Sequence, residues 1–120
     1  MAVESSARRT LLLTGATGFV GRHLDAALEV TNWNVRRATR DRSQAEQPGW
    51  VHLDVEEVST IEPALAGCDA AVYLIHSIDE SDDYPEREAR AAEAFRAAAE
   101  HVGLKRLVYL GGVAPVSYTH

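Results

Sequence analysis

Apolar and polar positions follow two different patterns along the chain, and together these patterns predict strands interspersed with helices. Short apolar runs of the length that strands have occur at 9–14, 34–39, 50–53, 70–75 and 106–110. Apolar residues recur at the three- and four-residue spacing of amphipathic helices over 18–30, 59–67 and 84–102. The middle helix has candidate N-caps in Ser59 and Thr60, Pro63 in its first turn and Gly67 as its end.

The order of these elements is strand, helix, strand, strand, helix, strand, helix, strand, with short connections. This order predicts an α/β fold with a doubly wound parallel sheet. Right-handed crossovers favour the strand order 3-2-1-4-5 and place ligand contacts at the carboxyl ends of strands 1, 2 and 4. With 120 residues the chain is one domain at most. We expect residues 9–113 to form that domain, 1–8 to be disordered and 114–120 to be an irregular tail.

The turn after the first strand carries Gly15, Gly18 and Gly21 at a spacing of three. A strand that turns through glycines into a helix directs free backbone N–H groups and the positive end of the helix dipole at one place, which suits a phosphate. Gly15 permits the tight turn, Gly18 lets a pyrophosphate approach, and Gly21 lets the helix pack closely on the strand. Because G-x-x-G-x-x-G differs from the usual G-x-G-x-x-G, the flanking strand and helix carry this prediction. The alternative is an ordinary strand-to-helix turn.

The end of the second strand distinguishes between the two nicotinamide dinucleotides. An NAD site usually has an acidic residue there, which binds the adenosine ribose, but in this chain Thr39 holds that position and Arg40 follows. A guanidinium binds a phosphate well, so the sequence favours NADP(H) over NAD(H). Asp41 would be the ribose acceptor if the register were shifted by one residue. Arg36 and Arg37 point to opposite sides of the strand, so at most one of them would help to bind the phosphate, and a surface role on an edge strand is favoured for both.

Other residues near the predicted site have two interpretations each. Asp54, just after the third strand, would accept a hydrogen bond from the adenine amino group or would be a loop aspartate that caps the next helix. Ala16, Thr17 and Phe19 line the glycine turn, although Thr17 could bond locally and Phe19 could belong to the core.

The charge and the single cysteine narrow the function classes. Residues 1–42 are basic and residues 43–120 are strongly acidic, for a net charge of −6, which argues against non-specific nucleic-acid binding and leaves a basic cluster at the second strand. Cys68 is the only cysteine, so a reducing compartment is expected, and we favour the cytoplasm. No apolar stretch reaches the roughly 20 residues of a membrane span.

Several segments together resemble the amino-terminal part of an atypical short-chain dehydrogenase/reductase, in the NAD(P)-binding, NmrA-like and complex I accessory-subunit-like group. These segments are Thr14-Gly15-Ala16-Thr17-Gly18-Phe19-Val20-Gly21, Ala38-Thr39-Arg40-Asp41, Asp54-Val55, Tyr73-Leu74-Ile75-His76-Ser77 and Val108-Tyr109-Leu110-Gly111-Gly112. The resemblance covers about residues 8–113 and implies a Rossmann fold that binds a dinucleotide, followed by a substrate region.

The resemblance also implies where each part of the dinucleotide lies. The pyrophosphate would be surrounded by Gly15, Thr17, Gly18, Phe19 and Val20. Arg40 would bind the 2′-phosphate, and Asp54 and Val55 would flank the adenine. The nicotinamide ribose would be bordered by Ile75, His76 and Ser77.

The chain departs from the family in its catalytic residues and in its end. Catalytic members carry a serine after the fifth strand and a Tyr-x-x-x-Lys pair, whereas this chain has Gly111-Gly112 there and no Tyr-x-x-x-Lys. Residues 114–120 resemble no continuation of the family. The catalytic residues and the small-molecule substrate therefore stay unknown, and we expect this part alone to be inactive. A non-catalytic redox sensor or structural subunit is the alternative.

Two remaining groups are candidates for chemistry. His76 and Ser77 are adjacent on an extended segment, so their side chains point apart, and packing or backbone contact is favoured over a nucleophile–base pair. The acidic stretch 79–83 lacks the ligand spacing of a calcium loop, and the histidines have no metal-ligand spacing. We therefore expect no metal site.

Overall fold

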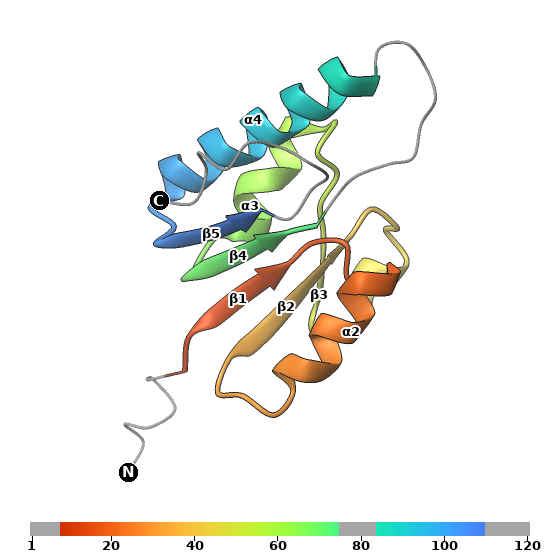
Figure 1. Cartoon of the computed structure of the whole chain (residues 1–120), viewed down its shortest axis with the longest axis vertical. Helices are drawn as coiled ribbons and strands as arrows, with labels where there is room; N and C mark the ends of the chain where they lie inside the picture. The colour runs from red at the N-terminus through yellow and green to blue at the C-terminus, as the bar shows by residue number, and fades with distance from the viewer. Residues whose placement is uncertain (1–7, 75–83, 110–120) are drawn as a thin grey trace.

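The computed structural model describes residues 8–74 and 84–109, which form one parallel sheet with helices on both faces (Figure 1). The strands are β1 Thr10–Leu13, β2 Asn34–Thr39, β3 Trp50–His52, β4 Ala70–Tyr73 and β5 Arg106–Tyr109. The helices are α2 Phe19–Leu28, α3 Ile61–Leu65 and α4 Tyr84–Val102, with short 3-10 turns η1 Gln44–Glu46 and η2 Val58–Thr60. The strand order is β3-β2-β1-β4-β5, all pairs parallel, which confirms the predicted doubly wound fold.

The core has two layers because successive residues of a buried strand point to opposite faces. In β1, Leu11 and Leu13 pack on the face that α2 covers, and Leu12 packs on the face that α3 and α4 cover. Phe95 of α4 is fully buried in the second layer. Within the described residues, no helix is long and apolar enough to cross a membrane.

Two adjacent arginines of β2 attach the sheet to a helix on each face. Arg36 donates from Nη1 to the backbone oxygens of Ala64 and Ala66, at 2.8 and 2.7 Å, and so satisfies carbonyls at the end of α3. Arg37 makes a two-point ion pair with Asp25 of α2, at 2.6 and 2.9 Å. The expectation of an edge-strand surface role is wrong, because β2 lies between β1 and β3.

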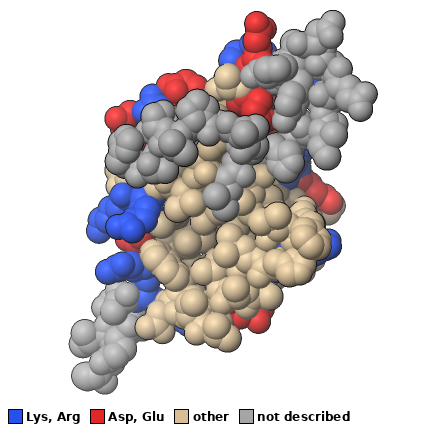
Figure 2. All heavy atoms as spheres, viewed as in Figure 1, with Lys and Arg blue, Asp and Glu red and all other residues tan. Residues whose placement is uncertain are grey.

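Charge is unevenly spread over the surface. On the face shown in Figure 2, the Lys, Arg, Asp and Glu side chains that are drawn lie mainly around the rim, and other residues occupy the middle, over the sheet and α2. The basic cluster expected around β2 is largely neutralised, because Arg37 pairs with Asp25 and Arg42 lies 3.6 Å from Glu57. Arg36 instead bonds to backbone carbonyls, and Arg40 lines the pocket described next.

Candidate functional site

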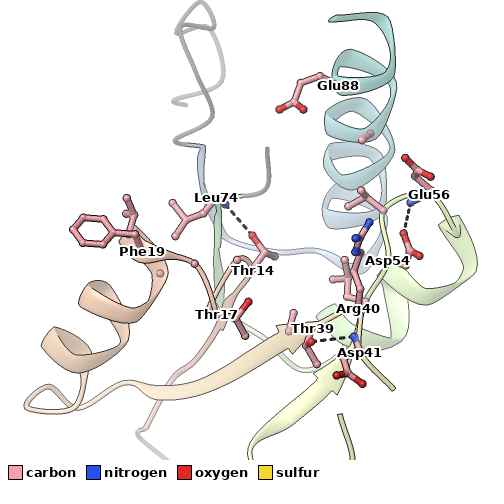
Figure 3. Close-up of a pocket in the computed structure, with 18 of the residues that line it drawn as sticks. Thr14, Thr17, Phe19, Thr39, Arg40, Asp41, Asp54, Glu56, Leu74 and Glu88 are labelled. Atoms are coloured by element: carbon pink, nitrogen blue, oxygen red, sulfur yellow. Dashed lines mark hydrogen bonds between the residues drawn. The ribbon is translucent and has the colours of Figure 1, made fainter. Parts of the chain in front are cut away.

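A pocket of about 880 Å³ lies where β1, β2, β3 and β4 end, between the start of α2 and the first turns of α4 (Figure 3). Its volume falls in the range of ligand pockets, roughly 300–1,000 Å³. The lining residues are Thr14, Gly15, Thr17, Gly18, Phe19, Val20, Gly21, Ala38, Thr39, Arg40, Asp41, Leu53, Asp54, Val55, Glu56, Leu74, Arg87, Glu88 and Ala91. The carboxyl edge of the sheet is thus the site, as the topology predicts.

The glycine turn is shaped by its own close packing. Gly15 has φ +70°, and a Cβ there would lie 3.0 Å from Cβ of Leu74. A Cβ on Gly21 would lie 1.9 Å from the backbone oxygen of Gly15, so only glycine lets the first turn of α2 approach this closely. Gly18 differs, since its Cβ would lie 3.5 Å from the nearest atom, an ordinary contact. The protein itself therefore needs glycine at 15 and 21 but leaves space above Gly18.

The start of α2 offers backbone donors to this space. Gly18 is its N-cap residue, no side chain caps the helix, and no acidic residue stands in its first turn. The first N–H groups of a helix have no partner inside it, so they are available to an anion in the pocket. Phe19 and Val20 are 70% and 56% exposed, which excludes the core role for Phe19.

The residues predicted for the glycine turn do not all line the pocket. Thr17, Phe19 and Val20 line it with the glycines, whereas Ala16 is 3% exposed and lies below the surface in the α2-side core. Ile75, His76 and Ser77 lie outside the described residues.

Thr14 joins the ends of β1 and β4, which the sequence did not reveal. Its buried hydroxyl donates to the backbone oxygen of Val72 at 3.0 Å and accepts the N–H of Leu74 at 2.9 Å. The strand order reverses direction at this pair, which is where ligands bind in sheets of this kind, and both Thr14 and Leu74 line the pocket. The Thr14 hydroxyl holds the two strand ends together there.

The end of β2 carries one cation into the pocket. The Thr39 hydroxyl accepts the backbone N–H of Asp41 at 3.1 Å, and Oδ1 of Asp41 accepts the N–H of Ser43 at 2.9 Å. Both groups thus hold the turn after β2. Arg40 is exposed, lines the pocket and makes no hydrogen bond or ion pair within the described part of the chain.

The turn after β3 forms the neighbouring wall. Oδ1 of Asp54 accepts the N–H of Glu56 at 3.0 Å, and the Asp54 N–H donates to the Thr60 hydroxyl at 2.9 Å. Thr60 occupies the N-cap position of α3, but its hydroxyl serves this turn instead of the helix. Asp54 therefore stabilises its own turn while it also lines the pocket with Val55.

The third wall comes from α4, through Arg87, Glu88 and Ala91. The sequence contains a signal for them, because Ala91 is one of the apolar residues that recur at helical spacing over 84–102, and one turn earlier on the same face lie Arg87 and Glu88. Arg87 Nη1 lies 3.6 Å from Oε2 of Glu56, so α4 and the turn after β3 meet at this end of the pocket. In Figure 3, Arg40, Asp54 and Glu56 share one side of the pocket, opposite Phe19.

A buried phenol lies behind the α4 wall. Tyr73 is 1% exposed, its hydroxyl has no hydrogen-bond partner among the residues that the structure describes, and its ring packs edge-on against those of Phe95 and Tyr109. Burial, with a smaller effect of the Glu88 charge, raises the pKa of Tyr73. The phenol is therefore neutral at ordinary pH. Among the described residues, no group of three or more His, Cys, Asp or Glu side chains could hold a metal ion.

The comparison with protein families identifies the fold's ligand class. A family model described as NAD(P)H-binding matches residues 15–116. The chain belongs to the NAD(P)H-binding family. The match includes the glycine turn and all three walls of the pocket. No curated protein matches the chain.

Several solved structures superpose on the chain. Uronate dehydrogenase from Agrobacterium tumefaciens has a TM-score of 0.70 at 24% identity, over 86% of this chain and 40% of the enzyme, and a mutant of it was solved complexed with NAD. An oxidoreductase from Lactococcus lactis has a TM-score of 0.67 at 25% identity, over 83% of this chain and 47% of that protein. UDP-N-acetylglucosamine 4-epimerase from Bacillus cereus has a TM-score of 0.69 at 16% identity, over 84% and 38%. The chain thus spans less than half the length of these proteins.

Proposed function

We propose that this chain is the NADP(H)-binding part of a longer oxidoreductase of the atypical short-chain dehydrogenase/reductase type, in the NmrA-like and complex I accessory-subunit-like group. Residues 9–113 would form the binding domain, with 1–8 and 114–120 outside it. The chain covers 40% of the length of uronate dehydrogenase. This supports a cofactor-binding part of a longer protein, with the substrate region in another part of that protein.

The pocket fits a dinucleotide in its middle section. The open space above Gly18 and the uncapped N–H groups of α2 suit a pyrophosphate. In this proposal Gly15, Thr17, Phe19 and Val20 surround it. Asp54 and Val55 would flank the adenine beside the apolar Leu53 and Ala91, which also line this region.

Arg40 is the observation that carries the choice of NADP(H). It is the exposed cation at the end of β2, and the two neighbouring oxygen groups, the Thr39 hydroxyl and Oδ1 of Asp41, already accept backbone N–H groups of the turn. A guanidinium with room to rotate binds a phosphate in a two-point manner. The Asp41 alternative is therefore less favoured than binding of a 2′-phosphate by Arg40.

The bound cofactor would supply hydride transfer. The described residues bind and orient it: the glycine turn fixes the diphosphate, and Arg40 and the Asp54 turn fix the adenosine. A proton donor for the substrate would come from residues outside the described part of the chain.

The test is a titration of the chain with NADPH and NADH. We expect Arg40→Ala to weaken NADPH binding by about ten- to a hundredfold, the value of a charged hydrogen bond, and to change NADH binding little. Arg42→Ala is the matched control, because Arg42 pairs with Glu57 and does not line the pocket. Equal NADPH affinity in the wild type and the Arg40→Ala variant would remove the NADP(H) assignment.

A second candidate is a binding protein that senses redox state or serves as a structural subunit. The observation that favours it is the absence of Tyr-x-x-x-Lys from the sequence. A structure of the longer protein with cofactor separates the two candidates, because an acid within hydrogen-bond reach of the nicotinamide's reaction partner would indicate an enzyme.

A further inference from the structure

Two ion pairs of equal length hold the turn after β3 from its two sides. Arg87 of α4 lies 3.6 Å from Glu56, and Arg42, which follows β2, lies 3.6 Å from Glu57. Only the first pair belongs to the pocket, because both Arg87 and Glu56 line it and neither Arg42 nor Glu57 does. The two pairs therefore differ in access to a ligand and not in length.

Arg87 lies at the same end of the pocket as Arg40. Glu56 is joined to Asp54 through its backbone N–H, and Figure 3 shows Arg40, Asp54 and Glu56 on one side. Arg87 reaches this side from α4, while Arg40 reaches it from β2. A group that enters between β2 and α4 thus meets a guanidinium from each wall.

The pair between Arg87 and Glu56 is easily exchanged. The Glu56 side chain is 63% exposed, and the separation of 3.6 Å is long for a hydrogen-bonded ion pair. Such exposed pairs contribute little, because water and salt screen them. A phosphate carries more charge than a carboxylate and accepts two parallel bonds from a guanidinium, so it competes well for Arg87.

Given the proposed NADP(H) site, we propose that Arg87 is a second guanidinium for the 2′-phosphate of the adenosine, and that it exchanges Glu56 for this phosphate when the ligand binds. Glu56 is then a competitor that weakens binding of the phosphorylated adenosine. The affinity for the 2′-phosphate is set by both charges, so the two residues determine specificity in opposite directions.

The experiment measures binding of adenosine 2′,5′-bisphosphate and of 5′-AMP, which differ only in the 2′-phosphate, by calorimetry at low salt. Arg87→Gln is expected to weaken bisphosphate binding by about five- to tenfold, and Glu56→Gln to strengthen it by roughly two- to fivefold. Binding of 5′-AMP should change less than twofold in both. Glu57→Gln, with the same substitution at the neighbouring residue, should leave both affinities unchanged.

Each other outcome has a defined meaning once circular dichroism shows that the variants are folded. If Arg87→Gln and Glu56→Gln both stay within twofold of the wild type while Arg40→Ala loses bisphosphate binding, this inference is wrong and the proposed function stands. If Glu56→Gln weakens binding as Arg87→Gln does, the pair only supports the wall, and the inference is again wrong. If Arg40→Ala also has no effect, the NADP(H) proposal itself fails.

Discussion

At the scale of single residues, the glycines at 15, 18 and 21 meet different physical requirements. A Cβ on Gly21 would collide with backbone atoms of Gly15 and Ala16, and backbone atoms cannot rotate away as the end of a side chain can. Gly18 has φ −82° and open space around it, so the folded chain alone tolerates a larger residue. Packing thus explains two of the glycines, and a ligand would explain the third.

This difference predicts that the same substitution to alanine affects folding stability at Gly21 and ligand binding at Gly18. Gly21→Ala should lower the free energy of unfolding by about 1–3 kcal/mol or more, because the new Cβ forces α2 away from the turn. Gly18→Ala should change it by less than about 1 kcal/mol but weaken NADPH binding. Urea denaturation measures the first effect and titration the second; a large stability loss in Gly18→Ala would contradict a ligand role for that glycine.

Sequence analysis found the pocket residues that stand out within one short segment, and it missed those that only the packing of distant elements places in the pocket. The glycine turn and Arg40 stand out because a strand, a turn and a helix are contiguous in the sequence. Arg87 and Glu88 come from a helix distant in sequence, and they reach the pocket only through the packing of α4 on α3 and the sheet. Thr14 was likewise invisible, since its hydroxyl bonds to residues 58 and 60 positions away.

At the scale of elements, one hydroxyl extends the joint between β1 and β4 beyond the backbone ladder. The ladder pairs end at Leu13 and Val72, the Thr14 N–H also donates to the Val72 oxygen, and the Thr14 side chain bridges the backbone of β4 on both sides of Tyr73. The position of Leu74 in the pocket follows from this bridge.

Replacement of Thr14 tests the bridge. Thr14→Val keeps the shape but leaves the buried N–H of Leu74 without its partner, which should cost about 1–3 kcal/mol of unfolding free energy. Thr14→Ser retains the hydroxyl and should lose clearly less. Denaturant midpoints of the two variants give the comparison; a Thr14→Val variant as stable as the wild type, or more stable than Thr14→Ser, would mean that the hydroxyl does not hold these strand ends.

Sequence patterns predicted the elements well and their ends less well. β2 and α4 have the predicted bounds, whereas the predicted strand 9–14 became Thr10–Leu13 and the helix 18–30 became Phe19–Leu28. Strand ends depend on pairing with neighbours, which periodicity does not contain. The surface role predicted for Arg36 and Arg37 is wrong for the same reason, because the groups that these arginines contact belong to other elements.

At the scale of the whole molecule, the ligand would contact the loops of four strands and two helices at once. Such a ligand binds only the folded chain, so it stabilises that state. At one hundred times its Kd, NADPH should add about 2.7 kcal/mol, or roughly 10 °C in Tm for a domain of this size.

Thermal scans with and without ligand measure this shift. NADH at the same concentration should give a smaller one, and adenosine, which has no phosphate, should give almost none. An unchanged Tm at saturating NADPH would contradict dinucleotide binding by this chain.

The contact between Gly15 and Gly21 has one further consequence. Because protein atoms alone hold this turn in shape, its amides are preorganised, and binding loses little conformational entropy there. NMR order parameters of the turn's backbone should consequently be high even before any nucleotide is added, and selection against larger side chains at these two positions should persist in relatives that have abandoned redox chemistry altogether.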